Sequence, residues 1–221
     1  MFTYCALFPK DYKIEKKMLV QLWIAQGYIQ STNGNEQLED IGDQYFNELL
    51  SRSLLEDVKK DDFDDTLSCK MHHFIHDLAQ SIVGSEILVL TSYVNKIAEE
   101  ARHVSFFEEV NPMIKALKGK PIRTFLNLCE DFYKDSTIVN SIFPSFMCLR
   151  ALSLNGMNVE KVPKCLGKLS HLRYLDLSYN DFKVLPNAIT RLKNLQTLKL
   201  IWCDSLKRIP DNIGELINLR H

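Results

Sequence analysis

Long apolar runs are missing from this 221-residue chain. No stretch of 18 or more apolar residues occurs, so the sequence predicts no transmembrane helix. The first residues, Met1 to Pro9, are apolar, but no basic stretch precedes them and Lys10-Asp11 ends them. This start differs from that of a signal peptide. We therefore expect a cytoplasmic protein without a membrane span.

The few glycines and cysteines are not arranged for phosphate or metal binding. None of the eight glycines opens a G-x-x-x-x-G-K-[S/T] loop, which is the motif that cradles nucleotide phosphates. The six cysteines contain no C-x-x-C pair, which disfavours both a zinc site and a disulfide framework. With 46% hydrophobic and 25% charged residues, the composition is that of a globular protein rather than a disordered one.

Charge is divided unevenly along the chain. Residues 1–90 hold 8 basic and 15 acidic residues, a net charge of −7, whereas residues 91–221 hold 19 and 13, a net charge of +6. Such asymmetry indicates two parts that differ in their partners or attract each other. We predict a domain at 1–90, a linker at 91–100 and a second domain at 101–221.

The second domain is built from repeats. The pattern L-x-x-L-x-L starts at Leu149, Leu172 and Leu195, 23 residues apart each time, and a further start at Leu219 is cut off by the end of the chain. The eighth residue after each start is Met157, Asn180 or Cys203, where leucine-rich repeats carry Asn or Cys. Because Met157 departs from this rule, we expect the first full repeat to be less regular.

A proline at one fixed phase distinguishes these repeats from a helical array with similar leucine content. Pro163, Pro186 and Pro210 each follow an aliphatic residue at the corresponding place. Two weaker units start at Ala101 and Ile122, which gives about five repeats. We predict an α/β leucine-rich-repeat solenoid with one short parallel strand per repeat, in which only stacking buries the leucines.

Residues between the leucines of each strand are expected on the concave face of that solenoid. Exposed tyrosine and tryptophan are typical anchors of protein interfaces. We therefore predict a protein-binding face formed by Tyr174, Asp176, Tyr179, Lys199 and Trp202. Any one of these residues could instead cover the edge of the solenoid; the prediction concerns the patch as a whole.

The first domain is predicted to be an α+β winged helix. Apolar residues recur at helical spacing over 15–26, where Gly27 makes a plausible stop, and again over 38–50. Two short strands at 54–58 and 66–71 flank an acidic loop at 59–65, and a helix follows at 72–83 with Leu78 and Ile82 expected to face inward. Nucleic-acid binding needs clustered Lys and Arg, which this acidic domain lacks.

An enzyme or metal site has little support. His72 and His76 have the i, i+4 spacing that can bind zinc, but no glutamate follows His72 as in H-E-x-x-H. We expect no catalytic residue and no metal.

Three motifs resemble plant NB-ARC leucine-rich-repeat disease-resistance proteins. They are Phe2-Thr3-Tyr4-Cys5-Ala6-Leu7-Phe8-Pro9 continued by Leu22-Trp23-Ile24-Ala25-Gln26-Gly27, then Met71-His72-His73 with the helix after it, and Arg102-His103-Val104-Ser105 with Arg123-Thr124-Phe125. The first is similar to the coiled-coil class of the family, and the second to its M-H-D motif. The resemblance assigns residues 1–90 to the winged-helix (ARC2) part of the NB-ARC module, truncated at its N-terminus.

This resemblance implies an immune receptor that switches between ADP and ATP. His72 corresponds to the motif histidine that contacts the ADP phosphate, and ADP/ATP would bind only in a full-length parent. The implied partners are the nucleotide-binding and coiled-coil domains of that parent, and a pathogen effector or a host protein that it guards. The repeats would bind protein and autoinhibit the switch.

Two departures from the family pattern leave an alternative open. His73 stands where the motif has Asp, which predicts weaker retention of ADP in a parent protein. No phosphate-binding loop is present, and Met1 stands where the family usually has Cys, so we expect a fragment or a truncated gene product that does not bind nucleotide by itself. The alternative is a free-standing protein-interaction module or decoy without nucleotide switching.

Overall fold

The computed structural model describes residues 1–31, 36–60, 62, 66–91, 97–108, 111–129 and 143–221. Residues 61 and 63–65 of the predicted wing loop and 92–96 of the predicted linker lie outside these ranges. The chain divides into a first unit, Met1–Ile87, and a second unit, Leu88–His221. Each is described by itself.

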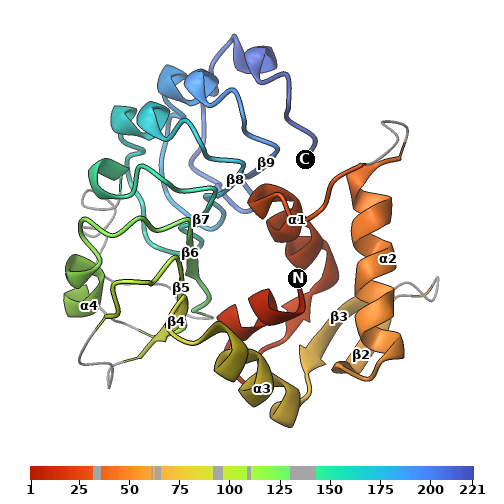
Figure 1. Cartoon of the computed structure of the whole chain (residues 1–221). Coiled ribbons are helices and arrows are strands. Elements are labelled where there is room, and N and C mark those ends of the chain that lie inside the picture. Colours follow the sequence, from red (N-terminus) through yellow and green to blue (C-terminus); the bar gives the residue numbers. More distant parts are fainter. Residues whose placement is uncertain (32–35, 61, 63–65, 92–96, 109–110, 130–142) are drawn as a thin grey trace. The chain divides into compact units, whose positions relative to one another are not determined.

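The first unit combines helices with a three-stranded antiparallel sheet of order β1-β3-β2 (Figure 1). Its order along the chain is helix, strand, two helices, hairpin and helix. The elements are a 3₁₀ helix η1 (Phe2–Leu7), β1 (Ile14–Glu15), α1 (Lys16–Gln26), α2 (Leu38–Ser51), β2 (Leu55–Lys60), β3 (Thr66–Met71) and α3 (His73–Val83). This is the order of helices and hairpin that the sequence predicted for a winged helix.

Helices α1 and α2 pack at unusually short range. Gly27 ends α1 in the left-handed conformation, with φ of 80°, which glycine adopts without steric cost. Gly42 of α2 lies so close to Val20 of α1 that an added Cβ would overlap its side chain. The core beside this contact includes Trp23 and Phe46, both at 0% exposure.

Helix α3 turns a different face inward than the sequence predicted. His76 and Ala79 are buried against η1, and the His76 Nε2–H donates to the Phe8 carbonyl over 2.8 Å. Leu78 and Ile82 are 51% and 61% exposed, so their prediction as inward residues was wrong. The apolar stripe of α3 is wider than the surface that η1 covers, and the buried histidine decides which half of it packs.

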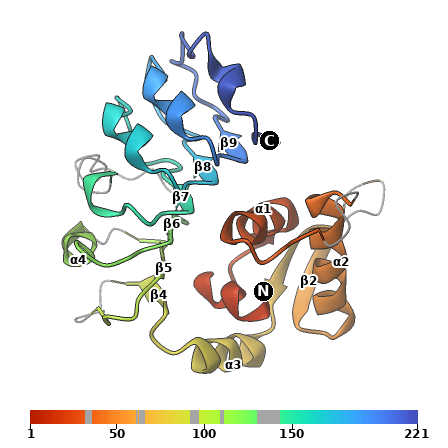
Figure 2. The same cartoon turned by 45° about the horizontal axis from the view of Figure 1, so that its top comes forward.

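The second unit contains a six-stranded sheet of order β4-β5-β6-β7-β8-β9, in which β5 to β9 are parallel (Figure 2). Its strands are β4 (Ile87–Leu90), β5 (His103–Phe106), β6 (Thr124–Asn127), β7 (Ala151–Ser153), β8 (Tyr174–Asp176) and β9 (Thr197–Lys199). Its helical elements are α4 (Asn111–Ala116), η2 (Lys164–Lys168), η3 (Asn187–Arg191) and η4 (Ile213–Glu215). Strand β4 lies in the stretch that the sequence assigned to the winged-helix domain.

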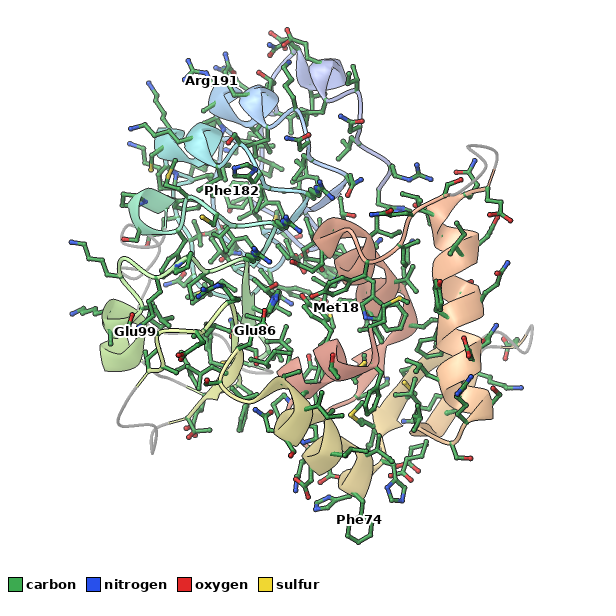
Figure 3. All side chains as sticks on the ribbon, in the orientation of Figure 1. Met18, Phe74, Glu86, Glu99, Phe182 and Arg191 are labelled. Atoms are coloured by element: carbon green, nitrogen blue, oxygen red, sulfur yellow. The ribbon has the colours of Figure 1, made fainter. Side chains whose placement is uncertain are left out.

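The repeat leucines make the core of the second unit. Leu149, Leu152 and Leu154 are fully buried, as are their counterparts one repeat later. Phe182, labelled in Figure 3, lies among them at 0% exposure. Burying one such side chain contributes about 1.5–3 kcal/mol, and each repeat obtains this by stacking on its neighbours.

Polar side chains close the turns after the strands. Asn180 accepts the Val159 N–H over 2.8 Å and donates to the carbonyls of Leu154, Leu177 and Ser178 over 2.8, 2.9 and 3.0 Å. Cys203, one repeat later, donates its S–H to Leu177 over 3.2 Å. Met157 supplies no amide, but the turn of its repeat is bonded by Asn180 and by Asn127, whose Nδ2 donates to Asn155. Neighbouring repeats therefore hold the irregular one.

Candidate functional site

His72 occupies the position at which α3 begins. It is the N-cap residue, and its Nδ1 accepts the backbone N–H of Phe74 over 3.3 Å. Because Nδ1 acts as an acceptor, a neutral His72 carries its proton on Nε2. The structure thus presents one N–H donor at a helix N-terminus, where the helix dipole favours an anion.

The donor of His72 faces a carboxylate of the neighbouring strand. Its Nε2 lies 3.9 Å from Oε2 of Glu56 on β2, and both side chains are partly exposed, at 39% and 45%. This distance is too long for a strong hydrogen bond, so Nε2 retains capacity for another acceptor. The Glu56 carboxylate would repel an anion at this place, and contact of His72 with a phosphate stays a prediction.

His73 and Asp77 share one lysine of the segment before β1. Lys10 Nζ lies 2.6 Å from Asp77 Oδ1 and 3.4 Å from His73 Nε2. The hydrogen bond from Lys10 lowers the pKa of the exposed Asp77 carboxyl below its usual value. An Asp at position 73, as in the family motif, would give Lys10 a second carboxylate and would suit the helix dipole better than histidine.

An apolar stripe that sequence reasoning missed runs along the outer face of α3. Phe74, Leu78 and Ile82 follow one another at i, i+4 spacing and are 76%, 51% and 61% exposed. The Phe74 ring points away from the ribbon in Figure 3. The sequence signal was present as a helix whose apolar residues exceed one face, but nothing in the sequence says which half is left uncovered.

The five residues predicted for the protein-binding face differ in accessibility. Tyr174 and Asp176 are buried: Lys199 Nζ lies 5.5 Å above the Tyr174 ring, and Asp176 Oδ1 accepts the Ser178 N–H over 2.9 Å. Tyr179 and Trp202 are exposed, at 41% and 66%. A partner on this face would meet these two rings first, and protein binding itself stays a prediction.

Tyr179 and Trp202 also have unusual backbone conformations. Their φ angles are 57° and 52°, and the equivalent residue one repeat earlier is Gly156, with φ of 65°. The left-handed conformation costs a residue with a Cβ roughly 1–2 kcal/mol, a cost that glycine avoids. Two large aromatics therefore stand where the repeat geometry favours glycine.

Arginines form a row across the strands of the second unit. Arg precedes each of the strands β5 to β8, Gln precedes β9, and Arg220 holds the same place in the last repeat. Backbone hydrogen bonds of 2.7–2.8 Å join each of these residues to the next; the row is Arg102, Arg123, Arg150, Arg173, Gln196 and Arg220. Adjacent strands lie about 4.8 Å apart, so the backbone positions of the row follow one another at that step. Sequence reasoning missed the row, although the position after the first leucine of each repeat carried the signal.

Three arginines of the row act on the buried His103. Burial, followed by the charges of Arg123, Arg150 and Arg102, lowers the pKa of His103 to about 4. The His103 Nδ1 and the Thr124 hydroxyl of the next strand are 2.8 Å apart. Of the residues in β5 to β9, Asp176 alone is acidic, and it is already bonded to the backbone.

Metal ligands are not gathered in the part of the chain that the structure describes. Among those residues, no three His, Cys, Asp or Glu side chains come together as a metal would require. The same part of the chain contains no helix with the length and hydropathy that crossing a bilayer demands.

Comparison with known proteins gives the family. The model of the disease resistance protein winged helix domain matches residues 7–79, and that of a leucine-rich repeat region matches residues 132–221. A putative disease resistance RPP13-like protein 1 of Arabidopsis thaliana is 36% identical over 89% of this chain and 19% of its own length. Two Solanum bulbocastanum proteins, the putative disease resistance protein RGA1 and the disease resistance protein RGA2, are 35% and 34% identical over 81% and 93% of the chain and 16% and 18% of their own lengths.

The chain thus spans less than a fifth of the length of these relatives. Its matches run from the winged helix through the repeats, in the order that the structure shows. The chain belongs to the plant disease-resistance proteins that combine a winged-helix domain with leucine-rich repeats.

Proposed function

We propose that this chain is the regulatory contact region of a cytoplasmic plant immune receptor, and that it acts by binding rather than by catalysis. Its repeats form a curved solenoid that holds the receptor's own coiled-coil and nucleotide-binding domains silent until a pathogen effector or a guarded host protein binds. The arginine row is the observation that carries the proposal, because a row of like charges on a partly exposed surface attracts an anionic partner, even though Arg102 also donates to the carbonyls of Glu99 and Ala101.

The spacing of the row favours an acidic helix as its occupant. One carboxylate per helical turn recurs about every 5.4 Å, close to the step of about 4.8 Å between strands. Side chains on one face of an extended peptide recur about every 6.6 Å and lose register within three steps. Arginine reaches carboxylates in bidentate pairs, and its long side chain accommodates the small mismatch per turn. We assign this acidic helix to the coiled-coil domain of the same receptor.

The apolar stripe of α3 is proposed to contact the nucleotide-binding domain of that receptor. It begins beside His72, so one docking event would cover Phe74 and bring the Nε2–H toward a bound phosphate. ADP or ATP would supply that phosphate in the whole receptor, and this chain's residues would contribute one hydrogen bond and a helix N-terminus. In the whole receptor, His72→Gln is expected to raise the ADP off-rate severalfold.

The arginine row can be tested on the full 221-residue chain. A labelled helical peptide of about 20 residues, with one Glu per turn, is titrated by fluorescence anisotropy at low and high salt. We expect the double variant R123E/R173E to weaken binding more than tenfold. The matched control reverses two cations of the helical turns, Lys164→Glu and Arg191→Glu, and should leave the affinity unchanged. Equal losses in both double variants would show only a loss of net charge and would overturn the proposal.

A further inference from the structure

Two exposed aromatic residues and an exposed isoleucine follow β8 and β9 and form a cluster, which we call the aromatic patch: Tyr179, Ile201 and Trp202. The Tyr179 N–H donates to the Ile201 carbonyl over 2.8 Å, so the two repeats present these residues side by side. The three side chains are 41%, 52% and 66% exposed. Within the described residues, neither aromatic ring has a ring or cation contact.

The backbone at Tyr179 and Trp202 has a conformation that their residue types disfavour. Gly156 takes the same conformation one repeat earlier, at no steric cost. Tyr179 and Trp202 keep the left-handed conformation in spite of its cost, and that conformation sets the direction of their Cα–Cβ bonds. Strain of this kind is typical of binding sites, where it aims a side chain in advance of the ligand.

Charge beside the patch is mixed, and the acidic residues are nearer to the rings in the sequence than the basic residues that follow them. An exposed aspartate lies two residues after each ring, Asp181 after Tyr179 and Asp204 after Trp202. On the neighbouring part of the face, Lys199 already rests over an aromatic ring, that of Tyr174. The next charged residues, Lys183 and Lys207, follow the turn and are joined to each other by a backbone hydrogen bond of 2.9 Å.

We propose that the aromatic patch binds a segment of a partner protein that carries arginine or lysine, with the cation over the rings of Tyr179 and Trp202 and against the carboxylates of Asp181 and Asp204. Tryptophan is the best aromatic acceptor for such a cation, and the carboxylates add a charged hydrogen bond. This site rests on the proposed protein-binding role of the repeats. The aromatic patch would bind a cationic segment, whereas the arginine row, at the other end of the same strands, would bind an acidic one.

The test titrates the full chain with a dye-labelled peptide of alternating glycine and arginine, and with the matching glycine–glutamate peptide. We expect saturable binding of the arginine peptide only. Trp202→Gly and Tyr179→Gly should each weaken it about tenfold, with a melting temperature that is unchanged or higher because strain is relieved. Phe107→Ala, at a ring of similar exposure on another segment, is the control and should change nothing.

Asp181→Asn combined with Asp204→Asn provides a second variant that leaves the rings and the fold in place. It should lower the affinity for the arginine peptide severalfold and abolish its discrimination against the glutamate peptide. Unchanged affinity in both the aromatic and the aspartate variants overturns the proposal. The variant R123E/R173E separates the two sites: it should lose the acidic helix and keep the arginine peptide, so either site can fail alone.

Discussion

The two units of this chain bury their apolar residues by different means. The first unit packs residues that are unrelated in sequence position, such as Trp23 and Phe46, around contacts as close as Gly42 to Val20. The second unit repeats one pattern, so that each strand leucine lies beside its equivalent in the next repeat. A repeated pattern determines which residues pair between neighbouring repeats, whereas the pairs in an irregular core depend on which faces of its elements meet. A mutation in the second unit should therefore also affect the neighbouring repeats, and a mutation in the first unit should act locally.

Loss of the Asn180 side chain should lower the stability of the second unit more than any other change considered. Asn180→Ala removes four hydrogen bonds and leaves the Val159 N–H buried without its acceptor. We expect a loss of about 3 kcal/mol in the free energy of unfolding of the second unit. Cys203→Ala removes only weak S–H contacts, to the carbonyls of Leu177 and Ile201, and should cost about 1 kcal/mol. Urea unfolding followed by far-UV circular dichroism measures both, and equal losses would contradict the role of the amide.

Protonation of His103 should weaken the second unit at low pH. The folded pKa of about 4 lies below the usual 6.5, so the unfolded chain binds the proton first as pH falls. Stability is fully present above pH 6.5 and is lost toward pH 4, by about 3 kcal/mol in total. His103→Gln should flatten this part of the pH profile of the unfolding free energy. A slope that persists in the variant would assign the loss to other groups.

Added methyl groups should distinguish the two kinds of packing. At Gly167 a Cβ would lie 2.5 Å from the Ala188 carbonyl of the next repeat, which is backbone and cannot rotate away, so Gly167→Ala should cost about 2 kcal/mol. Gly42→Ala meets the side chain of Val20, and the gain in helix propensity offsets part of the overlap, for a net cost of about 1 kcal/mol. Thermal unfolding of both variants tests this order, and the reverse order would contradict it.

Restoring the family motif should stabilise the first unit slightly. His73→Asp places a carboxylate in the first turn of α3 and beside Lys10. The helix dipole and the lysine together favour it by about 0.5 kcal/mol. Asp at position 81, in the last turn of the same helix, has the opposite relation to the dipole, so Ser81→Asp serves as the control and should not stabilise. Thermal unfolding in low salt compares them.

Changes on the outer face of α3 should have the smallest effect on stability. Phe74 is 76% exposed, so Phe74→Ser should alter the free energy of unfolding by no more than about 0.5 kcal/mol. The same change removes an exposed apolar ring and should reduce self-association at high protein concentration. Sedimentation velocity measures the second effect. A large loss of stability would show that Phe74 belongs to the core.

Periodicity explains what could be predicted from the sequence. The strand at 66–71 and the stop at Gly27 were predicted correctly because each has a local signal. The repeated leucines likewise gave the positions of β7, β8 and β9. The outward face of α3 could not be predicted, since it depends on the contact between His76 and η1.

Parts of the candidate site could not be predicted either, because they also depend on tertiary contacts. Burial of Tyr174 and Asp176 follows from tertiary contacts that no spacing reveals. The left-handed backbone at Tyr179 and Trp202 could not be predicted, because neither residue type favours it, although Gly156 stands at the equivalent place one repeat earlier. The arginine row, in contrast, was readable from the sequence at one fixed phase of the repeat.

A charge-swap cycle tests the central claim most directly. The wild-type chain and R123E/R173E are each titrated with the acidic helical peptide and with the same peptide carrying Lys in place of Glu at the two matching turns. We predict that the wild-type chain prefers the acidic peptide, and that the variant recovers most of that affinity with the lysine peptide while binding the acidic one more than tenfold more weakly. Failure of the lysine peptide to restore binding, with the variant still folded, would show that the arginine row is not where the acidic helix docks.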